Sequence, residues 1–422
     1  MTYALVDCNN FFVSCERLFR PQLEGKAVVV LSNNDGCVVA RSNESKAMGI
    51  RMGTPFFQLK SLVEKGMLEV CSSNYTLYGD ISSRVMSVLS DSVPKIEIYS
   101  IDEAFLLLDG MDSSEIPVLC SGIVDKVRKW VGVPVSIGVA PSRTLAKIAS
   151  HFAKKYSGYR GVCRIDSEQK RIKALSMTPV GDIWGVGRRM AVKMEAAGIK
   201  TALDFTLRPA DWVRKNFMLP GLRTWMELTG EDCAEHNAGQ ARKSICTSRS
   251  FADMIEDSEE IALRVADFAA RCAAKLRTEH TMAQDVTVYL HTNRFREDLP
   301  QYFPSATVRL PVAASSTREI LQAAMQAFST VYKPGYQYKK AGVVVDSIIP
   351  ENAVQTSLFD FDAGQRDKDN RLSKIMDELN RASGKELVRM ASQRPGHFAD
   401  GIRCEHRSRL YSTSLDEIIE VK

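Results

Sequence analysis

The sequence predicts a multidomain protein of mixed α+β and α/β class. Strand and helix patterns alternate over residues 1–177, only helices are predicted over 178–241, and residues 242–350 follow the order strand, helix, strand, strand, helix, strand. The last order is that of a small split βαβ sandwich. At 422 residues the chain is long enough for several domains with their own cores.

The first region begins with an apolar run over residues 3–7, typical of a buried strand, and a helix that Asn9 or Asn10 is expected to cap. Turn residues and glycines separate the elements that follow. The further predicted elements are strands over 27–31, 37–40, 95–99, 104–108 and 134–139, and helices over 42–48 and 142–155.

The last part of the chain holds two long helices, a linker and a tail. The helices begin near Ser258 and Thr317, and residues 351–365 are predicted to be a linker. The tail, 366–422, contains one amphipathic helix. Its predicted apolar face consists of Leu372, Ile375, Met376 and Leu379.

The composition permits nucleic-acid binding without requiring it. The net charge of +5 is mild, but residues 143–200 carry 13 Lys and Arg against 4 Asp and Glu. Such an excess is either a solvated helix face or a surface that faces phosphates, and charge alone does not decide between them.

Cysteine usage and hydropathy argue against two classes of protein. The ten cysteines are scattered, without a Cys-x-x-Cys pair or a Cys/His cluster, so a structural zinc site is not expected. No signal peptide and no membrane-length apolar run is found. We therefore expect a reduced, cytoplasmic, soluble protein with no membrane partner.

Three acids are candidates for a metal site. Asp7 ends the first strand, and Asp102 and Glu103 lie between two later strands. Carboxylates held by a rigid sheet suit Mg²⁺, and two such ions can stabilise the attacking and leaving oxygens of a displacement at phosphorus. An isolated acid in a turn is more often merely solvated, so the surrounding motifs must decide.

Three ordered motifs carry a family resemblance. They are Asp7-Cys-Asn-Asn-Phe-Phe-Val-Ser-Cys-Glu16, Tyr99-Ser-Ile-Asp-Glu-Ala-Phe105, and Ser136-Ile-Gly-Val-Ala140 followed by Leu145-Ala-Lys-Ile-Ala149. They resemble the signatures of the Y-family translesion DNA polymerases over about the first 350 residues. The resemblance implies a right hand with a ferredoxin-like palm and small fingers (1–177, fingers about 23–79), a helical thumb (178–241) and a βαββαβ little finger (242–350).

The resemblance also implies a catalytic centre with two Mg²⁺ ions and deoxynucleoside triphosphates as substrates. Asp7 and Asp102 would bind both ions, and Glu103 would bind the ion at the primer 3′-hydroxyl. The backbone carbonyl of Cys8 would complete the nucleotide-side ion.

Five residues are predicted to contact the nucleotide. Phe12 falls where the family carries an aromatic ring that clashes with a 2′-hydroxyl, whereas Phe11 is expected to pack in the core. Asn43 and Lys46 stand where many relatives have Tyr and Arg, and Lys is a point charge rather than a two-pronged donor. Lys154 matches a triphosphate-binding lysine and shares a helix face with Lys147, which is either functional or simply solvated.

DNA contacts are predicted in the second and third regions. Residues 183–189 resemble a helix-hairpin-helix, in which Gly185 and Gly187 let the backbone approach a phosphate beside Arg188. Arg249, on the first strand of the third region, is expected to hold the template backbone.

Two segments predict protein partners. Gln355, Leu358 and Phe359 resemble the peptide that binds the bacterial sliding clamp. Ser32-Asn-Asn-Asp-Gly36 and Arg407-Ser-Arg-Leu-Tyr-Ser-Thr413 resemble the UmuC branch of the family, whose members work with a processed UmuD-type dimer and a RecA filament.

The resulting hypothesis is an error-prone DNA polymerase that copies damaged template without proofreading, in the SOS response. Two other readings compete with it. Another two-metal nucleotidyl enzyme on a palm, such as a cyclase, would need neither the thumb motif nor the clamp peptide, and would act on nucleotides without a primer. A non-catalytic DNA-binding scaffold would not need all three acids.

Overall fold

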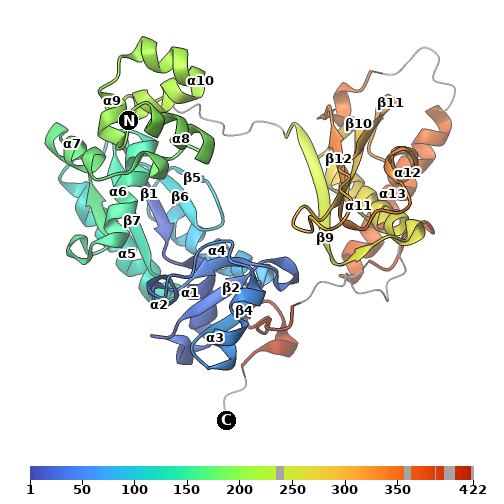
Figure 1. The fold of residues 1–422 in the computed structure, drawn as a ribbon, viewed down its shortest axis with the longest axis horizontal. Helices are drawn as coiled ribbons and strands as arrows, with labels where there is room; N and C mark the ends of the chain where they lie inside the picture. Colours follow the sequence, from blue (N-terminus) through green and yellow to red (C-terminus); the bar gives the residue numbers. More distant parts are fainter. Residues whose placement is uncertain (234–241, 356–362, 385, 394–403, 420–422) are drawn as a thin grey trace. The chain divides into compact units, whose positions relative to one another are not determined.

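The computed structural model describes residues 1–233, 242–355, 363–384, 386–393 and 404–419 (Figure 1). The chain divides into two compact units, one made of Met1–Ala238 with Cys404–Lys422 and the other of Gly239–Arg403. Within the described ranges, no helix is both long and apolar enough to cross a membrane. All ten cysteines lie in these ranges and are free thiols.

A five-stranded sheet with β1 at its centre organises the first unit. Strand β1 pairs antiparallel with β6 on one side and with β7 on the other, and β7 pairs parallel with β8. In sheet order the strands are β5 Ile96–Ile98, β6 Glu103–Leu107, β1 Tyr3–Cys8, β7 Val135–Ala140 and β8 Val162–Arg164.

The two faces of this sheet are covered by different helices, because side chains alternate along each strand. Ala4 and Val6 of β1 pack into one core with α1, α4 and α5, whereas Tyr3 and Leu5 pack into another with α6 and α7 to α10. The covering helices near the sheet are α1 Phe11–Phe19, α4 Tyr75–Ser90, α5 Glu115–Trp130 and α6 Arg143–Lys155.

Helix α6 lies unusually close to the sheet because β7 has no side chain at Gly138. A Cβ added there would clash with backbone atoms of Ala146, Ala149 and Ser150. Ser142 caps the helix by accepting the Leu145 N–H.

A smaller three-stranded sheet, in the order β3-β2-β4, belongs to the same unit. Its strands are β2 Val28–Leu31, β3 Val38–Arg41 and β4 Glu69–Ser72, with helices α2 Asn43–Ala47 and α3 Lys60–Glu64 beside them. The strands predicted over 27–31 and 37–40 are confirmed as the antiparallel pair β2 and β3. Strand β4, which pairs parallel with β2, was not predicted.

Within the described residues 167–233, helices build the region that follows β8, as predicted for the chain from residue 178 onward. They are α7 Glu168–Ser176, α8 Arg188–Ala196, α9 Ala202–Thr206 and α10 Ala210–Thr229. Glu227 of α10 is almost fully buried and accepts the Thr144 N–H at 2.7 Å. This carboxylate therefore ties the helical region to the amino end of α6.

The second unit is a four-stranded sheet in the order β11-β10-β12-β9 with two helices, and the predicted βαββαβ order is confirmed. The bounds are β9 Ser244–Ile255, α11 Ser258–Thr278, β10 Thr281–Thr292, β11 Ser305–Ala314, α12 Thr317–Val331 and β12 Tyr338–Asp346, with the short β13 Ile349–Pro350 beside β10. Buried residues of β9, β10 and β12 share one core with α11 and α12, and partly buried residues of β11 pack against it.

Two local predictions about helices are wrong. Asn10 occupies the N-cap position of α1 with φ 49°, but its side chain does not cap the helix. The tail helix α13, Ala363–Ser383, begins inside the predicted linker. Ser373 and Met376 are on its buried face, while most of the predicted apolar face is half exposed at Leu372 (50%), Ile375 (53%) and Leu379 (51%).

Polar contacts explain why α13 packs through the face that carries Ser373 and Asp377. Arg277 of α11 forms a two-pronged ion pair with Asp377, at 2.6 and 2.8 Å. The Ser373 hydroxyl accepts the Thr317 N–H at 3.1 Å, at the amino end of α12. These directional bonds fix the rotation of the helix against α11 and α12.

We predict that Gly138→Ala destabilises the first unit by about 3 kcal/mol or more, because the methyl group must displace backbone of α6. Urea unfolding followed by tryptophan fluorescence measures this, since all four tryptophans belong to the first unit. The control is Gly122→Ala on α5, where an added Cβ meets open space and the helix should gain about 0.5–1 kcal/mol. Equal stability of the two variants would contradict the prediction.

Candidate active site

Strand alternation brings Asp7 and Glu103 together. The two residues are cross-strand partners in the register of β1 and β6, and they continue the face that carries Leu5 and Phe105. Cβ atoms of such partners lie about 4.5–5.5 Å apart. Both carboxylates therefore project on the α6 side of the sheet.

Asp102 precedes β6 and is held by its own turn. The Cys8 N–H donates to the Asp102 carbonyl at 2.9 Å, which places the third acid beside the end of β1. The Ser100 hydroxyl donates to Asp102 Oδ1 at 2.6 Å and accepts the N–H groups of Asp102 and Glu103. The backbone thus gathers all three predicted acids at one edge of the sheet.

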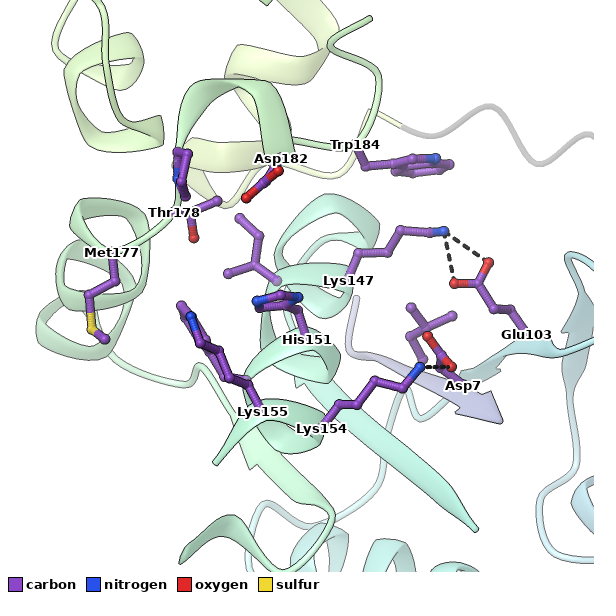
Figure 2. A pocket seen from close by; sticks show the side chains of 14 residues that line it. Asp7, Glu103, Lys147, His151, Lys154, Lys155, Met177, Thr178, Asp182 and Trp184 are labelled. Carbon is purple, nitrogen blue, oxygen red and sulfur yellow. Dashed lines mark hydrogen bonds and ion pairs between the residues drawn. The ribbon is translucent and has the colours of Figure 1, made fainter. Parts of the chain in front are cut away.

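Two lysines of α6 pair with two of these acids (Figure 2). Lys154 Nζ lies 2.7 Å from Asp7 Oδ1, and Lys147 Nζ lies 3.1 and 2.9 Å from the two oxygens of Glu103. Lys147 also lies over the rings of Tyr99 (4.6 Å) and Trp184 (5.1 Å). The shared helix face is confirmed, and Lys147 is not a freely solvated lysine.

Burial and neighbouring charges both act on the pKa of Glu103. Burial raises its pKa above the usual range, the bonds from Lys147 oppose that rise, and the nearby charges of Asp7 and Asp102 add to it. A divalent cation near these oxygens would favour the ionised form in the same way as Lys147 does.

The donor chemistry fits magnesium, although the side chains do not converge on one point. Asp7, Asp102 and Glu103 supply hard carboxylate oxygens, the ligands that Mg²⁺ prefers. Across the described ranges, no group of three His, Cys, Asp or Glu side chains is arranged to hold a metal ion. Asp7 and Glu103 instead point to the two lysines, which carry the positive charge (Figure 2).

A pocket of about 490 Å³ opens beside the acids and contains residues that the sequence analysis missed (Figure 2). His151 lines it from α6, and burial and the charge of Lys155 lower the pKa of its ring. Trp184 lines it from the predicted hairpin motif. His151 follows Lys147 by one helical turn, and that spacing was a usable signal.

Phe11 and Phe12 have different surroundings, as predicted. Phe11 is 3% exposed and belongs to the core, which leaves only its backbone for a nucleotide. Phe12 is half-buried, and its ring stacks on that of Tyr78 with centroids 4.5 Å apart and an interplanar angle of 18°. Tyr78, which the sequence analysis did not single out, therefore supports the predicted sugar contact.

Asn43 and Lys46 are linked to the start of α1. Asn10 donates to Asn43 Oδ1 at 3.0 Å and accepts from Lys46 Nζ at 2.5 Å. Burial and the charges of Lys154 and Arg41 lower the pKa of Lys46. An anion nearby would relieve this repulsion between the cations.

The glycines of the hairpin motif have the predicted freedom. Gly185 has φ +90°, a conformation that favours glycine, and Gly187 precedes α8 with open space where a Cβ would be. Both glycines and Arg188 are exposed. Backbone N–H groups at the start of α8 can therefore reach a phosphate.

The structure argues against the predicted role of Arg249. Its register partner on β12 is Ala341, a buried core residue, so Arg249 faces the helix layer of the second unit. Its Nε is buried and lacks a hydrogen-bond partner among the described residues.

The other face of that sheet carries a group that was not predicted. Tyr289 and His291 have ring centroids 4.9 Å apart, Phe303 lies next to His291 at 5.4 Å, and Lys340 Nζ lies 5.7 Å from the Tyr289 ring. Interleaved rings and cations are typical of nucleic-acid surfaces. Phe303 and Lys340 are distant in the sequence from Tyr289 and His291, so only strand pairing reveals the group.

Only the first residue of the predicted clamp peptide lies in the described part of the chain. Gln355 is exposed, whereas Leu358 and Phe359 lie outside the described residues.

Models of known protein families match three parts of the chain. The impB/mucB/samB family matches residues 6–151, and the C-terminal domain of the same family matches residues 242–358. A domain of unknown function, DUF4113, matches residues 370–421.

Curated relatives match the chain over most of its length. It is 40% identical to "Protein ImpB" of Salmonella typhimurium over 93% of each chain, and 38% identical to "Protein UmuC" of Salmonella typhimurium LT2 over 100% of each. It is 27% identical to "DNA polymerase IV" of Staphylococcus aureus over 84% of this chain and 98% of that one.

Two solved structures share the fold. A Y-family DNA polymerase chimera of Dbh and Dpo4 gives a TM-score of 0.65 at 21% identity, covering 83% of this chain and 100% of that one. An insertion ternary complex of Dbh DNA polymerase gives 0.55 at 20% identity with the same coverage. The predicted right-hand fold is therefore confirmed.

We predict that the cost of Lys147→Met grows with pH. Removing Lys147 lets burial raise the pKa of Glu103 further, so Glu103 is neutral at low pH and needs no cation, but is an unpaired half-buried carboxylate at high pH. Urea unfolding should therefore show a loss of about 1–3 kcal/mol at pH 8 and a smaller loss at pH 5.

The background Glu103→Gln is the control for this titration. There, Lys147→Met should cost the same at both pH values, because no carboxyl group remains at position 103. An equal loss at pH 5 and pH 8 in the wild-type background would show that Glu103 is not the group that responds.

Proposed function

The chain belongs to the impB/mucB/samB family of Y-family DNA polymerases, and we propose that Asp7, Asp102 and Glu103 are its catalytic acids. It is a UmuC-like, DNA-directed DNA polymerase that performs error-prone translesion synthesis in SOS mutagenesis. The observation that carries the assignment of the acids is the cross-strand pairing of Asp7 with Glu103, with Asp102 bonded to Cys8 at the same edge.

Magnesium is the metal that this set of oxygens fits. Two Mg²⁺ ions held by Asp7, Asp102, Glu103 and the Cys8 carbonyl would stabilise the attacking and leaving oxygens during nucleotide transfer. Lys147 and Lys154 compensate the charge of Glu103 and Asp7 in the protein without metal. A cation at Asp7 would leave the Lys154 ammonium free to bind the triphosphate.

The incoming deoxynucleotide is bound between α1, α2 and α6 in this proposal. Phe12 selects the sugar because its ring would clash with a 2′-hydroxyl, and stacking on Tyr78 holds that ring in place. Lys46, linked through Asn10 to Asn43, and Lys154 provide the cationic contacts for the phosphates. A single ammonium gives charge without the two-pronged geometry of arginine.

Primer-template DNA is held by both units. In the thumb, Gly185, Gly187 and Arg188 offer backbone N–H groups and a cation to a phosphate. In the little finger, the contact lies on the open face of the sheet at Lys340 and Tyr289, in place of Arg249.

The contacts with protein partners are assigned to the last part of the chain. Gln355, Leu358 and Phe359 form a sliding-clamp peptide. The exposed stripe Leu372, Ile375 and Leu379 on α13 supports a contact with a UmuD-type dimer or a RecA filament, since exposed apolar residues at helical spacing are typical of partner surfaces.

We predict that Asp102→Ala abolishes primer extension and leaves DNA binding largely intact. The loss should be about 10³-fold or more, because metal coordination contributes several kcal/mol at the transition state. Single-nucleotide extension measures the rate and fluorescence anisotropy measures DNA affinity. Asp125→Ala, an exposed acid on α5, is the matched control. Near-normal extension by the Asp102 variant would refute the metal assignment.

We also predict that Lys340→Ala weakens DNA binding and that Arg249→Ala does not. Removal of one phosphate contact lowers the slope of log affinity against log salt by about 1. Anisotropy titrations of both variants across a salt series measure the slope. If only the Arg249 variant changes this slope, the DNA-binding face proposed for the little finger is wrong.

A further inference from the structure

The C-terminal segment 404–411 adds to the edge of the three-stranded sheet in the first unit. Arg407 forms a parallel bridge with Ser72, the last residue of β4. The Ser72 N–H donates to the His406 carbonyl at 3.0 Å, and the His406 N–H donates to Ser72 Oγ at 3.0 Å. Main-chain bonds of this kind let a strand bind an exposed sheet edge.

Side chains fix the segment at its buried side. The Asn74 side chain caps α4 and donates to Ser408 Oγ at 3.0 Å and to the carbonyls of Ser408 and Arg409 at 3.2 Å each. Asn74 is 2% exposed and Ser408 is 8% exposed. Farther along, the Tyr411 ring stacks on Phe19 of α1, with centroids 4.8 Å apart.

Ser408 also completes a buried network behind the nucleotide site. Its hydroxyl donates to Glu16 Oε1 at 3.0 Å, and the Tyr78 hydroxyl donates to the same oxygen at 2.7 Å. Glu16 is fully buried, and burial raises its pKa while the two hydroxyl groups oppose that rise. A buried carboxyl group needs such donors, because unpaired burial is costly.

The network ends at Phe12. The face of the Tyr78 ring stacks on Phe12 while its hydroxyl group donates to Glu16, so one rigid side chain joins the network to the Phe12 ring. The path from the tail to the sugar contact therefore contains only Ser408, Glu16 and Tyr78.

We propose that the C-terminal segment is part of the nucleotide site, and that Ser408 is a positioning residue that fixes Phe12 through Glu16 and Tyr78. The proposal rests on the role of Phe12 in sugar selection given above. It assigns a function to residues 404–411 of the region matched as DUF4113. A segment from the far end of the chain thereby contributes to the choice of substrate.

The test is the ratio of kcat/KM for deoxyribonucleotides to that for ribonucleotides, measured on the full chain. Ser408→Ala should lower this ratio about 5- to 30-fold, the factor that corresponds to about 1–2 kcal/mol for the loss of one buried hydrogen bond. Ser408→Thr retains the hydroxyl group and should restore the ratio. Thr413→Ala, at an exposed position two residues after this segment, should not change it.

Phe12→Ala is the reference for the premise and must lower the ratio itself. In the Phe12→Ala background, Ser408→Ala should have no further effect, because both changes act on one ring. This non-additivity supports positioning over a general structural role.

Three results would overturn the proposal, and they can be told apart. If Phe12→Ala lowers the ratio and Ser408→Ala does not, the inference fails while the sugar-selection role stands. If Ser408→Ala lowers kcat/KM for both kinds of nucleotide equally, the residue is only structural. If Phe12→Ala leaves the ratio unchanged, the role of Phe12 fails and the proposal fails with it.

Discussion

Helix α6 can approach the central sheet closely because β7 presents a glycine at position 138, and the candidate site depends on that approach. The helix carries Lys147 and Lys154 seven residues apart, where their ammonium groups reach Glu103 and Asp7. Alternation along β1 and β6 turns Asp7 and Glu103 to the same side. The distances between cations and carboxylates therefore follow from backbone packing before any substrate or metal is considered.

The same packing sets the electrostatics of the site. Three carboxylates at one sheet edge repel one another, and burial adds to the cost for Glu103. The two lysines offset this charge in the protein without metal, through the ion pairs of Lys147 with Glu103 and of Lys154 with Asp7. We infer that bound metal ions would replace the ammonium groups of Lys147 and Lys154 as the partners of these carboxylates.

The opposite face of the central sheet carries the residue proposed to select the sugar. There α1 presents Phe12, and α4 presents Tyr78 behind it. Residues of the C-terminal segment complete the hydrogen bonds of this layer, although α13, which precedes that segment, belongs to the second unit. The tail is thus shared between the two units, and its two parts have different environments.

The sequence by itself determined the family and most of the strand and helix order, and it predicted the three acids and Phe12, because these follow from local periodicity and from short ordered motifs. It did not determine the buried face of α13, where apolar periodicity indicated Leu372 and Leu379 but ion pairs with α11 and α12 prevail. Nor did it reveal that Arg249 faces the core, or that Tyr289 and Lys340 share an open face, since strand register decides both. The contact of Ser408 with Glu16 joins residues 392 positions apart, and only tertiary packing creates it.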